Sequence, residues 1–74
     1  MKLILAGSRA EYNYLCLRKG LRPGQDAVYA DSPRATRDHD FEELWTYGNY
    51  YTRADANDIE KFAVNRGMKV RRVW

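Results

Sequence analysis

The chain has 74 residues, with 13 lysines and arginines against 10 aspartates and glutamates, which gives a formal net charge of +3. Apolar residues make up 45% of the chain and charged residues 31%, a balance typical of one small globular domain. The single cysteine, Cys16, excludes a disulfide within the chain and an all-thiolate zinc site. The longest uncharged run near the start, residues 3–8, is too short for a signal-peptide core or a membrane span, so we expect a cytoplasmic protein.

The first predicted element is a strand at residues 2–6, Lys-Leu-Ile-Leu-Ala, which is apolar on both alternating faces. Such a strand is typical of the centre of a largely parallel sheet. Residues 8–19 then predict a helix, and Gly20 is its expected left-handed stop. Apolar residues recur in this helix at spacings of four, three and four and predict its buried face, with Cys16 beside them as a structural cysteine. These residues are Ala10, Tyr14, Leu17 and Leu21.

A short second strand is predicted at residues 27–30, ended by Asp-Ser-Pro. The polar residues 34–40 that follow indicate a loop. Residues 44–47 predict a third strand, which Gly48 and Asn49 end. One helical turn at residues 41–44 is the open alternative, because Asp40 and Glu43 have the spacing of a capping box.

A second helix is predicted from about Ala54 to Arg66, and Gly67 ends it. Residues 69–74 predict a final strand. Because basic side chains crowd this strand and discourage further pairing, we expect it at an edge of the sheet. The expected buried face of the second helix consists of Ile59, Phe62 and Ala63, with Arg66 at its rim.

The order strand, helix, strand, loop, strand, helix, strand indicates two βαβ units with right-handed crossovers. We therefore predict a single α/β domain over residues 1–74, a miniature Rossmann-like βαβ-β-α-β fold. Its four-stranded, mostly parallel sheet has the order 2-1-3-4 and carries two helices. The orientation of the third strand stays open, because a parallel crossover usually needs a dozen residues or more and the preceding link is short.

The turn Gly7-Ser8-Arg9 stands where the first strand becomes the helix, and two interpretations of it remain open. As a ligand site, glycine permits close backbone approach, a helix N-terminus favours anions, and the Arg9 fork suits phosphate. As a structural turn, Ser8 and Glu11 have the spacing of a capping box and close the helix on themselves. No G-x-G-x-x-G or P-loop pattern is present, which excludes ordinary dinucleotide and P-loop sites.

Other polar residues follow the predicted strands, at the edge where ligands of open α/β sheets bind. Asp31 lies 24 residues after Gly7, near the spacing of a ribose-binding acid, and arginines on the next loop can close over an anion. Turn and solvated-loop roles are the alternatives for these residues. The full predicted anion or nucleotide site consists of Gly7, Ser8, Arg9, Asp31, Ser32, Arg34, Arg37, Gly48 and Asn49.

The opening KLILAGSR resembles the start of the SLOG group of Rossmann-like nucleotide-binding proteins, which begin with a hydrophobic strand and Gly-Ser-Arg. This resemblance covers residues 2–9 and implies nucleotide binding. The layout of the whole chain, with its VYADSP segment, aromatic strand and final helix, is similar to that of small Rossmann-like proteins of actinobacterial bacteriophages. That likeness implies a phage origin and a bacterial host.

Residues 45–53 concentrate aromatic side chains, more of them than a small core easily hides. Together with an arginine they form the mixture that is enriched in binding hot spots. Ordinary core packing, a protein partner or self-association, and base stacking are the open interpretations, and no nucleic-acid-binding motif supports the last. The predicted partner surface consists of Trp45, Tyr47, Tyr50, Tyr51 and Arg53.

The densest acidic stretch, residues 38–43, can bind Mg²⁺ or Mn²⁺ and support phosphodiester or phosphate chemistry. A solvated loop or a helix cap is the alternative interpretation. The single histidine excludes histidine-rich zinc sites. The candidate residues of this metal site are Asp31, Asp38, His39 and Asp40.

Three functional hypotheses follow from these features. We predict a small non-catalytic interaction protein without a cofactor, which binds a host protein or itself through the aromatic surface. Nucleotide or phosphate-metabolite binding around Gly7-Ser8-Arg9 is the alternative, and a metal-dependent nuclease or phosphatase is the third hypothesis. We expect neither a nucleic-acid nor a membrane partner.

Overall fold

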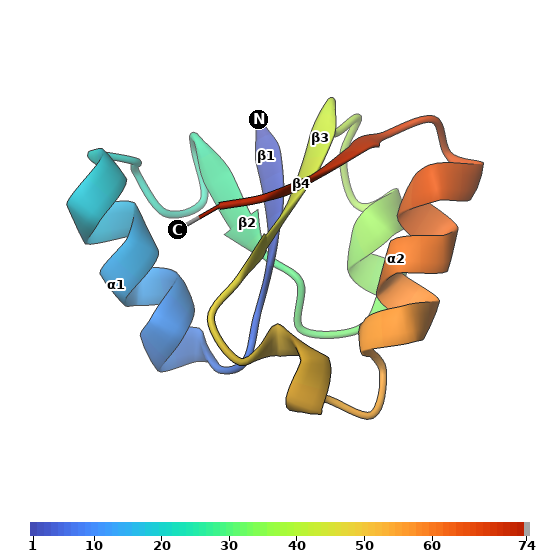
Figure 1. The fold of residues 1–74 in the computed structure, drawn as a ribbon. Helices are drawn as coiled ribbons and strands as arrows, with labels where there is room; N and C mark the ends of the chain where they lie inside the picture. Colours follow the sequence, from blue (N-terminus) through green and yellow to red (C-terminus); the bar gives the residue numbers. More distant parts are fainter. Residues whose placement is uncertain (74) are drawn as a thin grey trace.

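The computed structural model describes residues 1–73 and shows a four-stranded sheet between two helical layers (Figure 1). Every strand pairing is parallel and the strand order is β2-β1-β3-β4, so the predicted α/β class and strand order are confirmed. The open question of the third strand is resolved, because it runs parallel to both neighbours. The strands are β1 (Lys2–Ala6), β2 (Ala27–Tyr29), β3 (Glu43–Tyr47) and β4 (Lys69–Arg72).

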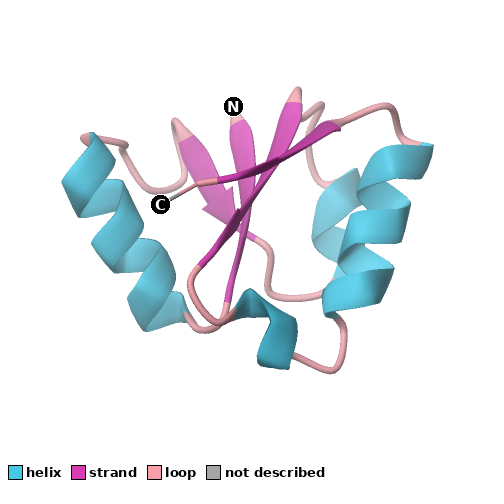
Figure 2. Ribbon diagram, viewed as in Figure 1, coloured by secondary structure: helices cyan, strands magenta, loops and turns pink. Residues whose placement is uncertain are grey.

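The helices cover the two faces of the sheet unequally (Figure 2). On one face lies α1 alone, and on the other face α2 packs beside η1. This division follows from right-handed crossovers, since connections leading toward β3 and β4 run on the face opposite α1. The helical elements are α1 (Arg9–Lys19), η1 (Pro33–Arg37), η2 (Tyr50–Thr52) and α2 (Ala56–Asn65).

The loop predicted at residues 34–40 is wrong over most of its length, because Pro33–Arg37 forms the 3₁₀ helix η1. Proline presets the backbone at the start of this helix, and the Thr36 hydroxyl donates a 2.9 Å hydrogen bond to the Pro33 carbonyl. The link at residues 30–42 therefore crosses from β2 to β3 as a compact helical turn beside α2. Residues 43 and 44 belong to β3, so the alternative helical turn at 41–44 is wrong.

The core consists of two clusters on either side of β1, which is buried on both faces as its apolar sequence predicts. Leu3 and Leu5 pack toward α2 and η1, whereas Ile4 and Ala6 pack toward α1. Each of the three large side chains is fully buried, and each such burial stabilises the fold by about 1.5–3 kcal/mol. β1 is thus the central element that positions the other strands.

The buried face predicted for the first helix is wrong at Ala10, Tyr14 and Leu17, and only Leu21, which follows the helix, packs against the core. Leu15 and Cys16 are buried in α1, whereas Tyr14 and Leu17 are 54% and 81% exposed. The structural role predicted for Cys16 is confirmed.

Two polar contacts explain the orientation of α1. Its Tyr12 hydroxyl donates a 2.8 Å hydrogen bond to the Ala27 carbonyl under the helix. Its Glu11 carboxylate accepts hydrogen bonds from the backbone at the ends of β1 and β3. Both side chains must point toward the sheet, so the stripe at Ala10, Tyr14 and Leu17 faces away from it.

In α2, the structure buries Ala56, Ile59 and Ala63, while Phe62 is 43% exposed and was wrongly predicted to be buried. β4 lies at an edge, as its basic residues predict. The last position of the predicted strand, Trp74, lies outside the described residues. Within residues 1–73, no helix is long and apolar enough to cross a membrane.

Candidate functional site

Part of the predicted ligand site comes together at the carboxyl ends of β1 and β3. Gly7 directly follows β1, and Gly48 and Asn49 directly follow β3, which is the neighbouring strand. The backbone N–H groups of Gly7 and Asn49 both point to one position, where they are 2.8 and 3.1 Å from a carboxylate oxygen. This oxygen is Oε1 of Glu11, so the chain's own side chain occupies the predicted anion position.

The two glycines are needed for this internal carboxylate. A Cβ atom on Gly7 would lie only 2.6 Å from Glu11 Oε1, and a Cβ atom on Gly48 would collide with the same carboxyl group. Gly48 also has a φ of +63°, a left-handed conformation that favours glycine. Close backbone approach, predicted at Gly7 as a property of a ligand site, here accommodates Glu11.

Ser8 caps α1 through its side chain. Its Oγ accepts a 3.2 Å hydrogen bond from the Glu11 N–H, as half of a capping box. The other half departs from the motif, because the Glu11 carboxylate bonds to Gly7 and Asn49. The turn therefore ends β1, starts α1 and joins both to the end of β3.

Arg53 closes the same edge of the sheet from the opposite side. Its Nη1 donates to the carbonyls of Ala6 and Ala30, at 3.1 and 2.7 Å, and so bridges the ends of β1 and β2. The rest of the guanidinium forms two 2.9 Å hydrogen bonds with Asp55. Only 13% of the Arg53 side chain is exposed, so this predicted partner residue lies inside the fold.

A cavity of about 380 Å³ beside β2 brings Arg9 and Asp31 together. The Arg9 guanidinium lies 4.8 Å from the centre of the Tyr29 ring, as a cation–π pair. Asp38 also lines this cavity. Ser32 precedes η1, and two further predicted anion ligands, Arg34 and Arg37, are exposed on η1 and do not line the cavity.

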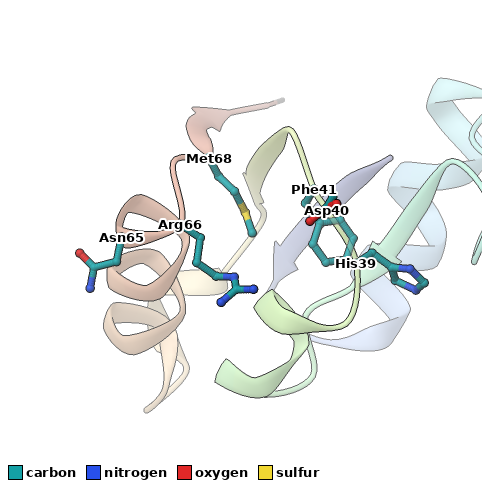
Figure 3. Close-up of a pocket in the computed structure, with 6 residues that line it drawn as sticks. All are labelled: His39, Asp40, Phe41, Asn65, Arg66 and Met68. Carbon is teal, nitrogen blue, oxygen red and sulfur yellow. The ribbon is translucent and has the colours of Figure 1, made fainter.

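A second cavity, of about 350 Å³, lies between the end of α2 and the segment that leads into β3 (Figure 3). The Arg66 side chain, just after the end of α2, extends toward this segment. His39 belongs to the segment, and its ring points away from α2. His39 and Asp40 line this cavity, whereas Asp31 and Asp38 line the other one. Among residues 1–73, no group of three His, Cys, Asp or Glu side chains is arranged to hold a metal ion.

The predicted aromatic surface is divided by the sheet. Trp45 and Tyr47 are partly buried on the α1 face, and the Trp45 indole N–H donates a 2.8 Å hydrogen bond to Glu43. This bond, followed by the contact with Lys2, lowers the pKa of the Glu43 carboxyl. Tyr50 packs against the cluster on the opposite face. These residues therefore do not form one continuous surface.

The most exposed aromatic side chain of the described residues, Tyr51, lies on η2, with 63% of its surface in solvent. Its ring meets the Tyr50 ring edge-on, with 5.7 Å between the centroids. Its hydroxyl donates a 3.3 Å hydrogen bond to Asn49 Oδ1. The Arg72 guanidinium stands 5.9 Å from the Tyr50 ring centre. We call residues 49–52 the tyrosine turn.

Sequence reasoning missed two residues of these sites. Glu11 was considered only as a cap, although its spacing from Ser8 was the signal that could have placed it near the turn. Arg72 was considered only as an edge charge, and its position over Tyr50 depends on the register that pairs Arg72 with Thr46. Cys16 offers no nucleophile, because burial raises the pKa of its thiol and keeps it protonated at neutral pH.

Comparison with models of known protein families gives no match, and comparisons with curated proteins and with solved structures also give none. The resemblances to SLOG-like and phage proteins therefore stay predictions. The contacts described above carry the functional argument.

Proposed function

We propose that this chain is a small non-catalytic interaction protein, which binds a partner protein through the tyrosine turn. The observation that carries the proposal is the combination of exposure and support at Tyr51. This ring is 63% exposed, yet Tyr50 and Asn49 hold it on two sides. A large aromatic ring that is already ordered loses little side-chain entropy on binding, which is the property of hot-spot tyrosines.

The charges near the tyrosine turn favour an acidic partner. The Arg72 guanidinium lies over Tyr50. A second copy of the chain would bring the same cation to the contact, and like charges oppose association. If the predicted phage origin is correct, the partner is a protein of the bacterial host.

The proposal is tested with Tyr51→Ser, which removes the exposed ring and leaves the core clusters intact. The matched control is Val64→Ser, because Val64 is 61% exposed on α2, away from η2. We expect Tyr51→Ser to weaken binding to an identified acidic partner by at least about tenfold, or about 1.4 kcal/mol, in isothermal titration calorimetry. The control should bind as the wild type does, and both variants should keep the wild-type melting temperature.

Light scattering of the wild type distinguishes a partner protein from a second copy. We expect a monomer at micromolar concentration. A dimer that Tyr51→Ser dissociates would retain the tyrosine turn as the binding site but make the partner a second copy. Equal binding by Tyr51→Ser and the wild type would refute the proposal.

A further inference from the structure

Helix α1 has two apolar faces, and only one of them is used by the fold. Its inner face packs against the sheet through Tyr12, Leu15 and Cys16. Leu17 lies two residues after Leu15, and a rotation of about 100° per residue places it about 200° around the helix. Ala10 and Tyr14 precede Leu17 by seven and three residues and share its side of the helix.

We call this second face, formed by Ala10, Tyr14 and Leu17, the outer stripe. Leu17 is 81% exposed and Tyr14 is 54% exposed, so the fold gains little from their apolar surface. Figure 1 shows why, since α1 is the outermost layer on its side of the sheet. The spacing of the stripe, four then three residues, is the seam by which one helix packs along another.

The charges beside the outer stripe all have one sign. Arg9, one residue before Ala10, and Arg18, one residue after Leu17, are exposed at the two flanks of the stripe. The Arg18 guanidinium lies 5.8 Å from the centre of the Tyr14 ring. The only acidic residue of α1 is Glu11, whose carboxylate is held at the strand ends by backbone N–H groups. The outer surface of the helix therefore presents cations and apolar side chains without a carboxylate.

We propose that the outer stripe is a second docking site, which binds an acidic amphipathic helix of a partner protein. Apolar side chains of that helix pack on Tyr14 and Leu17, and carboxylates at its flanks meet Arg9 and Arg18. α1 has 11 residues, which is a length of about 16 Å, so the site accommodates about three helical turns. Docking by an apolar helix face flanked by complementary charge is a recurring recognition mode.

A second copy of the chain is a poorer occupant of the outer stripe. In either orientation, an α1–α1 pair brings together two surfaces that each carry two cations, Arg9 and Arg18, and no carboxylate. A contact limited to two such short helices is also smaller than the interface of about 1,200 Å² that a stable dimer buries. An acidic helix replaces this charge repulsion with attraction.

The test uses a synthetic helix-forming peptide with leucines on one face and glutamates on both flanks. A control peptide carries the same leucines with lysines in place of the glutamates. Chemical shifts of the ¹⁵N-labelled protein are followed during titration with each peptide. We expect the glutamate peptide to shift the amide signals of residues 10–18 at the outer stripe, and the lysine peptide to shift none.

Protein variants then separate this site from the tyrosine turn. We expect Leu17→Gln to weaken binding of the glutamate peptide about tenfold, equivalent to about 1.4 kcal/mol. Val64→Gln, a control with comparable exposure on α2, and Tyr51→Ser should both bind as the wild type does. Binding that depends on Tyr51 and not on Leu17 would overturn this inference and leave the proposed function standing.

Other outcomes would also overturn the inference. If the lysine peptide bound as tightly as the glutamate peptide, the occupant would not be selected by its acidic charge. A wild-type dimer that Leu17→Gln dissociates in light scattering would make a second copy the occupant. Sedimentation with vesicles of anionic phosphatidylglycerol, lost in Leu17→Gln, would make a lipid surface the occupant.

Discussion

The outer stripe of α1 differs from the carboxyl ends of β1, β2 and β3, which we call the strand-end crevice, in how far contacts within the chain cover its side chains and backbone groups. In the crevice, Glu11 and Arg53 bond to the backbone of β1 and its neighbours. On the outer stripe, Tyr14 and Leu17 face solvent. The polar region predicted to bind a ligand is closed by internal contacts, and the apolar region predicted to be core is open. This contrast teaches that residue types indicate where a contact surface lies. They do not indicate whether the surface is covered by another part of the same chain or is left open to solvent.

The largest expected effect separates the two faces of α1. Leu15→Ala should lower the free energy of unfolding by about 3 kcal/mol, because it leaves a cavity under a fully buried side chain. Leu17→Ala, the same change two residues later, should cost less than about 0.5 kcal/mol. Urea unfolding followed by tryptophan fluorescence measures both. Equal losses would mean that the outer stripe contributes to the core, which would contradict the comparison.

The next effect concerns the closure of the crevice. Arg53→Met keeps a long apolar stem but removes the donors to the Ala6 and Ala30 carbonyls. We expect a loss of about 2 kcal/mol in the free energy of unfolding, since hydrogen bonds to a charged group are worth about 1.5–3 kcal/mol. Arg34→Met, at an exposed position on η1, is the control and should change little. Equal stability of the two variants would show that Arg53 does not hold the strand ends.

A smaller effect tests whether the crevice is an anion site that the chain itself fills. Glu11→Ala removes the acceptor of the Gly7 and Asn49 N–H groups and should cost roughly 1.5 kcal/mol. We expect inorganic phosphate to raise the melting temperature of this variant and to leave the wild type unchanged, because only the variant has the two donors open. Thermal unfolding with sodium chloride at matched ionic strength is the control. Equal stabilisation of the wild type by phosphate would place an anion elsewhere.

The central position of β1 was predictable, because Leu3 and Ile4 are adjacent and both apolar, and only a strand covered on two faces uses such a pair. The rotation of α1 was not. Its sequence contains two stripes with helical spacing, and the choice between them depends on Glu11. That carboxylate bonds to Asn49, which is 38 residues away along the chain. Periodicity within a helix carries no information about a partner on another strand.

The candidate site shows the same division. Gly7 and Asn49 were placed together correctly, because the carboxyl ends of neighbouring parallel strands share one edge of the sheet. The sequence did not reveal that the group between them belongs to α1. The sequence pattern also did not show that the aromatic residues lie on both faces of the sheet. Tyr47 and Tyr50 reach opposite faces because the chain turns at Gly48.

The smallest expected effect tests whether an exposed ion pair stabilises the fold as much as the contacts of the strand-end crevice do. In the turn between α1 and β2, the Asp26 carboxylate accepts hydrogen bonds from the Arg22 side chain and backbone, at 2.8 to 3.2 Å. The Arg22 guanidinium, then the Arg22 N–H, holds the pKa of Asp26 below its usual value of 3.8. A carboxyl whose pKa is lower in the folded state stabilises the fold above the unfolded pKa, and this contribution is lost as pH falls through the folded pKa.

The melting temperature of the wild type should therefore fall more steeply below pH 4 than that of Asp26→Asn, which cannot titrate at this position. The carboxyls of Glu42 and Glu43 also have lowered pKa values, chiefly through hydrogen bonds from Lys2 and Trp45 respectively. The wild type and Asp26→Asn both retain these two carboxyls, so the difference between their melting temperatures at each pH reports the contribution of Asp26. Because water and salt screen an exposed pair, we expect a smaller shift than for Glu11→Ala. A shift as large as that of Glu11→Ala would mean that the turn at Arg22 closes the fold as firmly as the strand ends do.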